Sequence, residues 1–199
     1  FDRLHTVHMR VGALPQYPTN ALKYNLTWST DGLINEYCNP CEAIVEGQLK
    51  EVPPLEEVEH FSLDGDDYEA FNTSGGLGTL CETLDGKVDQ LNYRTVRYLG
   101  HRNIMKLLIK DLRMGERKEL LKDIFEHALP MTFQDVVLIF VTVTGYREGR
   151  FVQESYARKV YAREIGGVTW SAIQITTASG MAAMVDLMAN GKLPNKGFV

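Results

Sequence analysis

The sequence has no excess of positive charge and no basic stripe. Its 21 lysines and arginines are outnumbered by 26 aspartates and glutamates, which gives a net charge of −5. Domains that bind nucleic acids carry clustered basic side chains, so nucleic acid is a poor candidate for a partner. The sequence also has no long uncharged apolar run. The most apolar segment, residues 136–143, is far shorter than the roughly 20 residues that cross a bilayer. We therefore expect neither nucleic-acid binding nor a membrane span.

Cysteine is scarce, and the three residues present do not form a metal-binding pattern. Cys38 and Cys41 form a Cys-x-x-Cys pair, which suits a redox site or half of a zinc site. No second pair and no His-x-His follows at metal-ligand spacing, and Pro40 inside the pair indicates a turn. We expect ordinary reduced thiols in a reducing cytoplasm, and no metal.

The sequence also has no internal repeat, no low-complexity linker and no regular alternation of strands with helices. Apolar periodicity instead indicates that strands cluster along the chain. This order favours a single α+β domain over residues 1–199, with a mostly antiparallel sheet and helices packed on it. The predicted strands lie at residues 4–14, 43–46, 48–52, 58–63, 68–72, 93–99, 135–147 and 151–165, and the predicted helices at residues 21–37, 104–112, 117–129 and 169–190, with a short one ending at residue 84.

Local signals support several of these boundaries. Glu46-Gly47 predicts a tight hairpin, because glycine adopts the positive φ that such turns need. The continuous β-branched run in residues 135–147 is typical of a central strand covered on both faces. Gly191 is placed to end the last helix in the left-handed conformation.

No motif identifies a reaction. The sequence contains no Ser/His/Asp order, no His-Glu-x-x-His and no P-loop. Gly76 and Gly78 form a Gly-x-Gly, but the third glycine of a dinucleotide loop would fall on Cys81, and no βαβ pattern surrounds it. Two interpretations of this loop remain: a turn that lets a small ligand approach the backbone, and a purely structural turn.

Arg97 lies on an alternating strand, on the opposite side from Tyr98. An arginine at a strand end is well suited to bind a carboxylate with two hydrogen bonds. The residues alone nevertheless favour a solvated or ion-paired arginine, and for His101 they favour a capping or surface role over catalysis. Trp28 is predicted to lie in a helix and to belong to the core or to a pocket wall. The acidic runs at residues 56–59 and 64–67 are predicted to form solvated faces.

Three segments together resemble the saccharopine dehydrogenase family. They are Lys23-Tyr24 with the run from Thr27 to Tyr37, the run from Ala70 to Leu80, and the run from Thr95 to His101. They stand in the expected order and cover nearly the whole chain. The resemblance implies a two-part enzyme, in which a Rossmann domain binds NAD or NADP. A second α+β domain, similar to the catalytic domain of glyceraldehyde-3-phosphate dehydrogenase, binds the amino-acid substrate and forms a homodimer.

The chain resembles only that second domain. Its start at Phe1 without methionine and its ending at Val199 lead us to expect a piece of a longer protein, with no cofactor bound to this chain and no activity of the piece alone. The resemblance assigns a substrate carboxylate to Arg97 and the walls of the substrate cleft to Trp28, Ser29, Asn72, Thr73 and Ser74. It identifies no proton-transfer residue.

The reaction implied is NAD(P)-dependent oxidation of the C–N bond of saccharopine in lysine metabolism, giving glutamate and aminoadipate semialdehyde. Two alternatives stay open. One is the substrate domain of a lysine 6-dehydrogenase, and the other is a ligand-binding or dimerisation module without catalysis.

Overall fold

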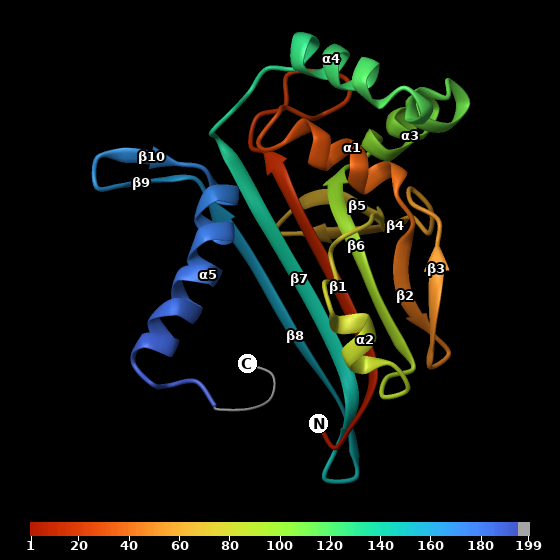
Figure 1. Ribbon diagram of the computed structural model, residues 1–199, viewed down its shortest axis with the longest axis vertical. Coiled ribbons are helices and arrows are strands. Elements are labelled where there is room, and N and C mark those ends of the chain that lie inside the picture. The colour runs from red at the N-terminus through yellow and green to blue at the C-terminus, as the bar shows by residue number, and fades with distance from the viewer. Residues whose placement is uncertain (195–199) are drawn as a thin grey trace.

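The computed structural model describes residues 1–194 and is organised around one mixed β-sheet (Figure 1). Its main path has the strand order β3-β2-β6-β1-β7-β8, and the hairpin of β4 and β5 joins it through β6. Strands β1 and β6 run parallel, and the other neighbours are antiparallel. The strands are β1 (Arg3–Pro15), β2 (Cys41–Val45), β3 (Gln48–Val52), β4 (Glu59–Leu63), β5 (Asp66–Asn72), β6 (Gln90–Tyr98), β7 (Asp135–Arg147) and β8 (Arg150–Tyr161). The predicted α+β class with a mostly antiparallel sheet is confirmed.

Three helices gather at one end of the long strands (Figure 1). They are α1 (Thr30–Cys38), α3 (His101–Lys106) and α4 (Lys118–Ala128); a π-helical turn, η1 (Leu107–Asp111), and a 3-10 turn, η2 (Met114–Glu116), connect α3 to α4. Leu33, Tyr37, Phe71, Met105 and Leu121 meet in the core between these helices and the sheet. This end of the molecule therefore has the thickest apolar core.

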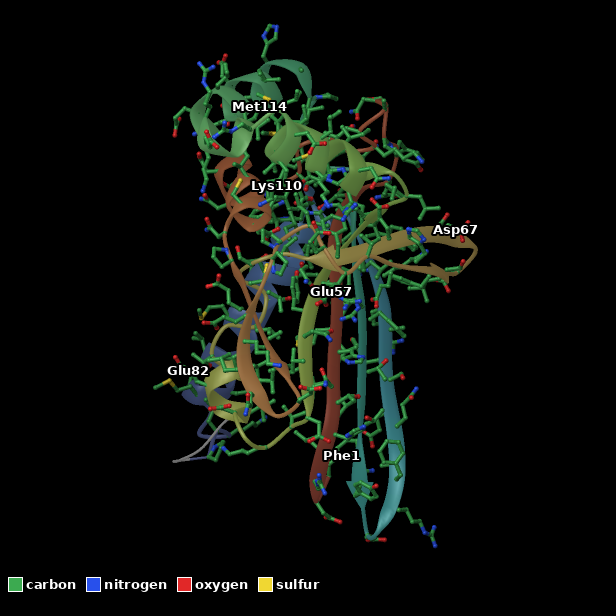
Figure 2. All side chains as sticks on the ribbon, turned by 90° about the vertical axis from the view of Figure 1, so that its right-hand side faces the viewer. Phe1, Glu57, Asp67, Glu82, Lys110 and Met114 are labelled. Carbon is green, nitrogen blue, oxygen red and sulfur yellow. The ribbon has the colours of Figure 1, made fainter. Side chains whose placement is uncertain are left out.

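The two faces of the sheet are covered differently. Helices α2 (Leu80–Leu84) and α5 (Ala172–Ala189) lie on one face, and the β4–β5 hairpin crosses the other. In Figure 2 the hairpin projects away from the sheet, with Asp67 at its tip, while Glu82 of α2 lies on the opposite side. A small separate hairpin, β9 (Arg163–Ile165) with β10 (Val168–Trp170), leads into α5.

Helix α5 is anchored at its start and exposed along the rest of its length. Ser171 and Gln174 form a capping box, and the Asp135 carboxylate accepts a hydrogen bond of 3.0 Å from the backbone nitrogen of Ile173. Farther along, Met181 and Met188 are largely exposed. By length and composition α5 could cross a membrane, with a mean hydropathy of 1.2. Length and composition alone do not identify a membrane span, because a helix that packs against another protein surface has the same composition.

The structure corrects several local predictions. Residues 21–29 form a loop, not a helix, because the Ser29 side chain caps α1 and Asn20 holds the backbone oxygen of Tyr24 at 2.7 Å. Strand β8 ends at Tyr161, where the predicted strand was to continue to residue 165, and α5 begins three residues later than expected. Strand β7 has the predicted bounds, but only its first four residues and Gly145 are fully buried, because α5 covers one end of it.

Candidate functional site

A cavity of about 730 Å³ lies between the sheet, the loop before α1 and the first turns of α5. The sheet provides its floor through β1, β6 and β7, and α1 contributes one acidic side chain, Glu36. The size suits a small-molecule ligand. The lining residues are Val11, Gly12, Ala13, Thr27, Trp28, Glu36, Tyr93, Thr95, Arg97, Val137, Trp170, Ile173, Gln174, Thr177 and Ala178.

Arg97 brings a buried positive charge to this cavity, with only 2% of its surface exposed. Its Nε donates a hydrogen bond of 2.8 Å to the Tyr37 hydroxyl, and its Nη1 donates one of 2.9 Å to the backbone oxygen of Val96. The guanidinium carbon lies 5.3 Å from the centre of the Tyr24 ring, a cation–π distance. Within residues 1–194, no carboxylate forms an ion pair with Arg97 and nothing accepts a hydrogen bond from its Nη2. The charge is therefore available to an anionic ligand.

Hydrogen bonds to the start of α3 explain why the acidic residue opposite Arg97 on the neighbouring strand forms no ion pair with it. Glu69 of β5 stands opposite Arg97 of β6, but its carboxylate accepts hydrogen bonds from the backbone nitrogens of Gly100 and Arg102 instead. These contacts hold the start of α3, where the backbone nitrogens have no partner within the helix. Glu69 thus has a structural role at the start of α3.

His101 is the end of a buried hydrogen-bond chain that starts at Arg97. Its Nδ1 lies 2.9 Å from the backbone oxygen of Leu22, which can only accept, so Nδ1 carries the proton. Its Nε2 then accepts from the Tyr37 hydroxyl at 3.0 Å. Burial, together with the charge of Arg97, lowers the pKa of His101 to about 3. The predicted capping or surface role is wrong, because the ring is a neutral, buried support for Tyr37 and Arg97.

Trp28 forms part of the cavity wall, which is one of the two roles predicted for it, the other being a place in the core. The ring lies against Gly32, where a Cβ would come within 2.4 Å of it, and its Nε1 donates a 3.1 Å hydrogen bond to the Tyr24 hydroxyl. Gly32 therefore leaves the space that the indole of Trp28 occupies against α1. Ser29, the neighbour of Trp28, caps α1 by accepting from the Gly32 nitrogen at 3.2 Å. It does not line the cavity.

Of the other predicted wall residues, only Thr73 lines a cavity, and it is a second, smaller one. Thr73 lines a cavity of about 220 Å³ with the glycine-rich loop, and Tyr93 borders both cavities. Asn72 instead donates a 3.3 Å hydrogen bond to the backbone oxygen of Pro53, and Ser74 donates one of 3.3 Å to that of Asn35. The structure thus brings Arg97 and Trp28 together in one cavity, and it places Ser29, Asn72 and Ser74 outside both.

Among the residues that sequence reasoning missed are Glu36 and Tyr93, which line the cavity, and Tyr37, which holds Arg97 from behind the lining. Glu36 carried a readable signal. It follows the buried Leu33 by three positions and precedes the buried Tyr37, so helical spacing puts a carboxylate beside the core face. The contacts of Tyr37 and Tyr93 connect elements far apart in the chain, so no local sequence pattern predicts these contacts.

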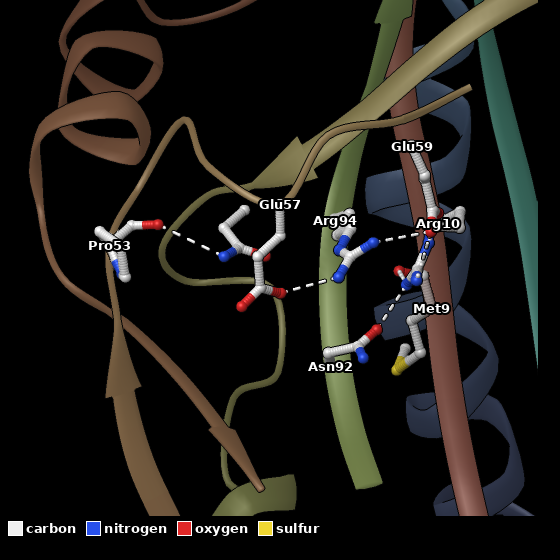
Figure 3. Close-up of polar contacts among 8 residues, drawn as sticks. Met9, Arg10, Pro53, Glu57, Glu59, Asn92 and Arg94 are labelled. Carbon is white, nitrogen blue, oxygen red and sulfur yellow. Dashed lines mark hydrogen bonds and ion pairs between the residues drawn. The ribbon is translucent and has the colours of Figure 1, made fainter. Parts of the chain in front are cut away.

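The other arginines near the middle of the sheet are neutralised, which sets Arg97 apart. Figure 3 shows the Glu59 carboxylate receiving both Arg10 and Arg94, with Arg94 also paired to Glu57 at 2.7 Å. Asn92 accepts a further 2.7 Å hydrogen bond from Arg10. The predicted solvated face at residues 56–59 is confirmed in part: Glu57 and Val58 are exposed, and Glu56 and Glu59 are partly exposed. The three carboxylates also serve as counter-ions on the face that carries the β4–β5 hairpin.

The cysteines offer no obvious nucleophile. All three are free thiols, and burial, reinforced by Glu51 and Glu57, raises the pKa of Cys41 to about 12. Within residues 1–194, no group of three or more histidine, cysteine or acidic side chains is arranged to hold a metal ion. The chemistry available at the cavity is consequently ionic recognition and hydrogen bonding.

The fold and the cavity together define an α+β domain in which a buried arginine lines a cavity of small-molecule size. Residues 2–199 match the family described as the saccharopine dehydrogenase C-terminal domain, and the chain belongs to this family. Its fold is similar to that of the apo histidine-tagged saccharopine dehydrogenase (L-Glu forming) from Saccharomyces cerevisiae, with a TM-score of 0.73 at 13% identity. The match covers 99% of this chain but only 61% of the yeast chain.

Proposed function

We propose that this chain is the substrate-binding domain of an NAD(P)-dependent oxidoreductase that oxidises the C–N bond of saccharopine. Family membership supports the class of enzyme. The observation that carries the substrate assignment is Arg97, a buried guanidinium that lines the large cavity and has no counter-ion within residues 1–194. Saccharopine carries carboxylates, and a charge-assisted hydrogen bond from a buried guanidinium is a strong one.

The described residues do not fit a dinucleotide cofactor. The loop at residues 74–79 leads into α2, a helix of five residues, and the strands that flank it, β5 and β6, are antiparallel. A Rossmann site needs parallel strands and a longer helix whose N-terminus receives the pyrophosphate. We infer that the nicotinamide, which accepts a hydride in such enzymes, binds to a part of the protein outside this chain.

The contribution of this domain to the reaction is positioning. Arg97 holds a substrate carboxylate, and Tyr37 and His101 hold the guanidinium in its orientation. A fixed substrate presents its C–H bond at one angle, which lowers the entropic part of the barrier. Loss of hydride from that carbon gives an imine, and water then releases glutamate and aminoadipate semialdehyde.

We also propose that the protein forms a homodimer through the sheet or the β7–β8 hairpin. Strand β8 is the last strand on its side of the sheet, and Phe151, Tyr156 and Tyr161 are exposed along it. An exposed edge with apolar side chains is suited to pairing with a second copy. Light scattering of the complete protein at high concentration tests this, and a monomeric mass contradicts it.

The function is tested by NADH production in the complete polypeptide that contains this chain. Saccharopine and lysine are offered in turn to the wild type and to Arg97→Ala. We expect activity with saccharopine and a KM raised at least about tenfold in the variant, since a buried carboxylate loses its charged partner. Activity with lysine alone reassigns the substrate. No activity with either leaves a binding module, and a micromolar affinity of this chain alone for NAD(H) contradicts the placement of the cofactor.

A further inference from the structure

The large cavity contains a negative charge as well as the positive charge of Arg97. Glu36 lies in α1 and lines the cavity, and its backbone oxygen accepts a 3.0 Å hydrogen bond from the nitrogen of Ser74, which fixes this turn of the helix. Burial raises the pKa of Glu36, while the charge of Arg97 acts to lower it. Glu36 is only partly exposed, and it is one of the residues that line the cavity.

Glu36 differs from the other acidic side chains in this part of the molecule. The carboxylates of Glu56, Glu59 and Glu69 each accept hydrogen bonds from two partners. Within residues 1–194, nothing donates a hydrogen bond to the Glu36 carboxylate, and it forms no ion pair with Arg97. A partly buried carboxylate is destabilised by the loss of water unless something compensates for it. For the other three carboxylates the fold provides hydrogen bonds, whereas for Glu36 it provides only the attraction of Arg97 without a direct contact.

Glu36 and Arg97 share one cavity and attract each other, but within residues 1–194 they form no direct ion pair. They come from different elements, α1 and β6, so the packing of the helix on the sheet sets their separation. The other ionisable groups that face Glu36 are Tyr24, Tyr37 and Tyr93, which are neutral at physiological pH because burial raises the pKa of each phenol. The cavity thus presents one fixed anion and one fixed cation.

We propose that Glu36 binds the ammonium group of an amino-acid ligand whose carboxylate is bound by Arg97. This assignment rests on the proposed function of Arg97 and adds the group that recognises the other charge. An α-amino acid carries both charges on one carbon, and the cavity of about 730 Å³ leaves room for its side chain. A ligand with the carboxylate alone leaves Glu36 without a partner and is rejected for that reason.

The test compares ligands that differ by one ammonium group in binding to the complete polypeptide. The probes are L-lysine with 6-aminohexanoate and L-glutamate with glutarate, each titrated by calorimetry into the wild type, Glu36→Gln and Arg97→Lys. Glutamine has nearly the shape of glutamate without its charge. Glu82→Gln, on the exposed surface of α2, is the matched control.

We expect the wild type to bind at least one amino acid about 10-fold or more tightly than its partner without the ammonium group, as for a buried charge pair. Glu36→Gln should reduce this ratio to below about 3 with little effect on the weaker ligand, and Glu82→Gln should keep it. Arg97→Lys should weaken both ligands of the pair. An unchanged ratio in Glu36→Gln overturns the assignment of Glu36 and leaves Arg97 untouched. No binding of any probe to the wild type overturns both assignments.

Thermal unfolding without ligand shows whether Glu36→Gln changes binding or merely destabilises the protein. Since the unpaired carboxylate is unfavourable in the unliganded protein, Glu36→Gln should unfold at the same temperature as the wild type or a higher one at neutral pH. A stable variant that has lost the discrimination supports a binding role. A clearly lower unfolding temperature shows that Glu36 is a structural residue and contradicts the proposal.

Discussion

The hydroxyl of Tyr37 lies between Arg97 and His101, accepting from the guanidinium Nε at 2.8 Å and donating to the imidazole Nε2 at 3.0 Å. These two hydrogen bonds require a charged guanidinium, a protonated phenol and a neutral imidazole. A protonated imidazole would have no lone pair for the phenol and would add a second positive charge beside Arg97. The neutral histidine therefore keeps Tyr37 oriented. Because Tyr37 accepts from Nε and the backbone oxygen of Val96 accepts from Nη1, Nη2 of Arg97 is left for the cavity.

Removal of the Tyr37 hydroxyl should cost both stability and ligand affinity. Tyr37→Phe leaves Nε of Arg97 and Nε2 of His101 buried without partners, which destabilises the protein by about 1–3 kcal/mol. Urea unfolding measures the loss, and titration with the amino-acid ligand should show weaker binding because Arg97 is less firmly oriented. Tyr17→Phe is the matched control, because Tyr17 is 68% exposed. Equal stability of the two variants would contradict the role of this hydroxyl.

His101 should make the protein sensitive to acid. Its folded pKa of about 3 lies below the unfolded value of 6.5, so between these values the unfolded chain binds the proton and the folded chain does not. Stability due to this residue is thus complete above about pH 6.5 and falls as the pH falls, by about 2 kcal/mol at pH 5. Thermal unfolding from pH 7 to pH 4 should show a shallower slope in His101→Asn. The exposed His127→Asn should keep the wild-type slope, and identical slopes for all three proteins would refute the assignment.

Gly76 should be intolerant of even a methyl group. A Cβ at this position would lie 2.3 Å from the Tyr93 ring, which borders both cavities. Gly76→Ala should destabilise the protein by about 1–3 kcal/mol and weaken ligand binding as Tyr93 shifts. Gly180→Ala is the contrasting control: its Cβ meets nothing within 4 Å inside α5, so we expect a gain of up to about 1 kcal/mol. Thermal unfolding separates the two, and equal shifts would argue against the Tyr93 contact.

Glu59 should contribute more to the free energy of unfolding than Glu57, two residues before it. Glu59→Gln removes the counter-ion shared by Arg10 and Arg94, and we expect a loss of about 2 kcal/mol, reduced from the fully buried case because the side chain is partly exposed. Glu57 pairs with Arg94 alone and is half exposed, so Glu57→Gln should cost less than about 1 kcal/mol. Urea unfolding of both variants checks the order, and a larger effect at Glu57 would contradict it.

The sequence predicted those parts of the fold that local patterns determine. The β-branched run of β7 was placed with its observed bounds, and Glu46 and Gly47 form the predicted hairpin turn with φ of 55° and 76°. The loop at residues 21–29 was misread as helix because its apolar residues fill the core without helical backbone. The parallel pairing of β1 with β6 connects segments about 80 residues apart, so no local sequence pattern predicts it.

The site was predicted only in part, for a similar reason. Arg97 and Trp28 were found through resemblance to a family, and the structure brings them to one cavity. Glu36 was overlooked because a single acidic residue in a helix usually faces water. Its burial depends on α1 packing against the sheet beside Arg97, which is a tertiary relationship. Ser29 and Asn72 share the same motifs but serve the backbone, so membership in a motif did not reveal which residues line the cavity.

The most direct test is a crystal structure of the complete protein with saccharopine bound. We predict a substrate carboxylate within about 3 Å of the Arg97 guanidinium nitrogens, the distance of a charge-assisted hydrogen bond. A substrate bound elsewhere, with Arg97 still facing an empty cavity, would contradict the assignment of this domain as the substrate site.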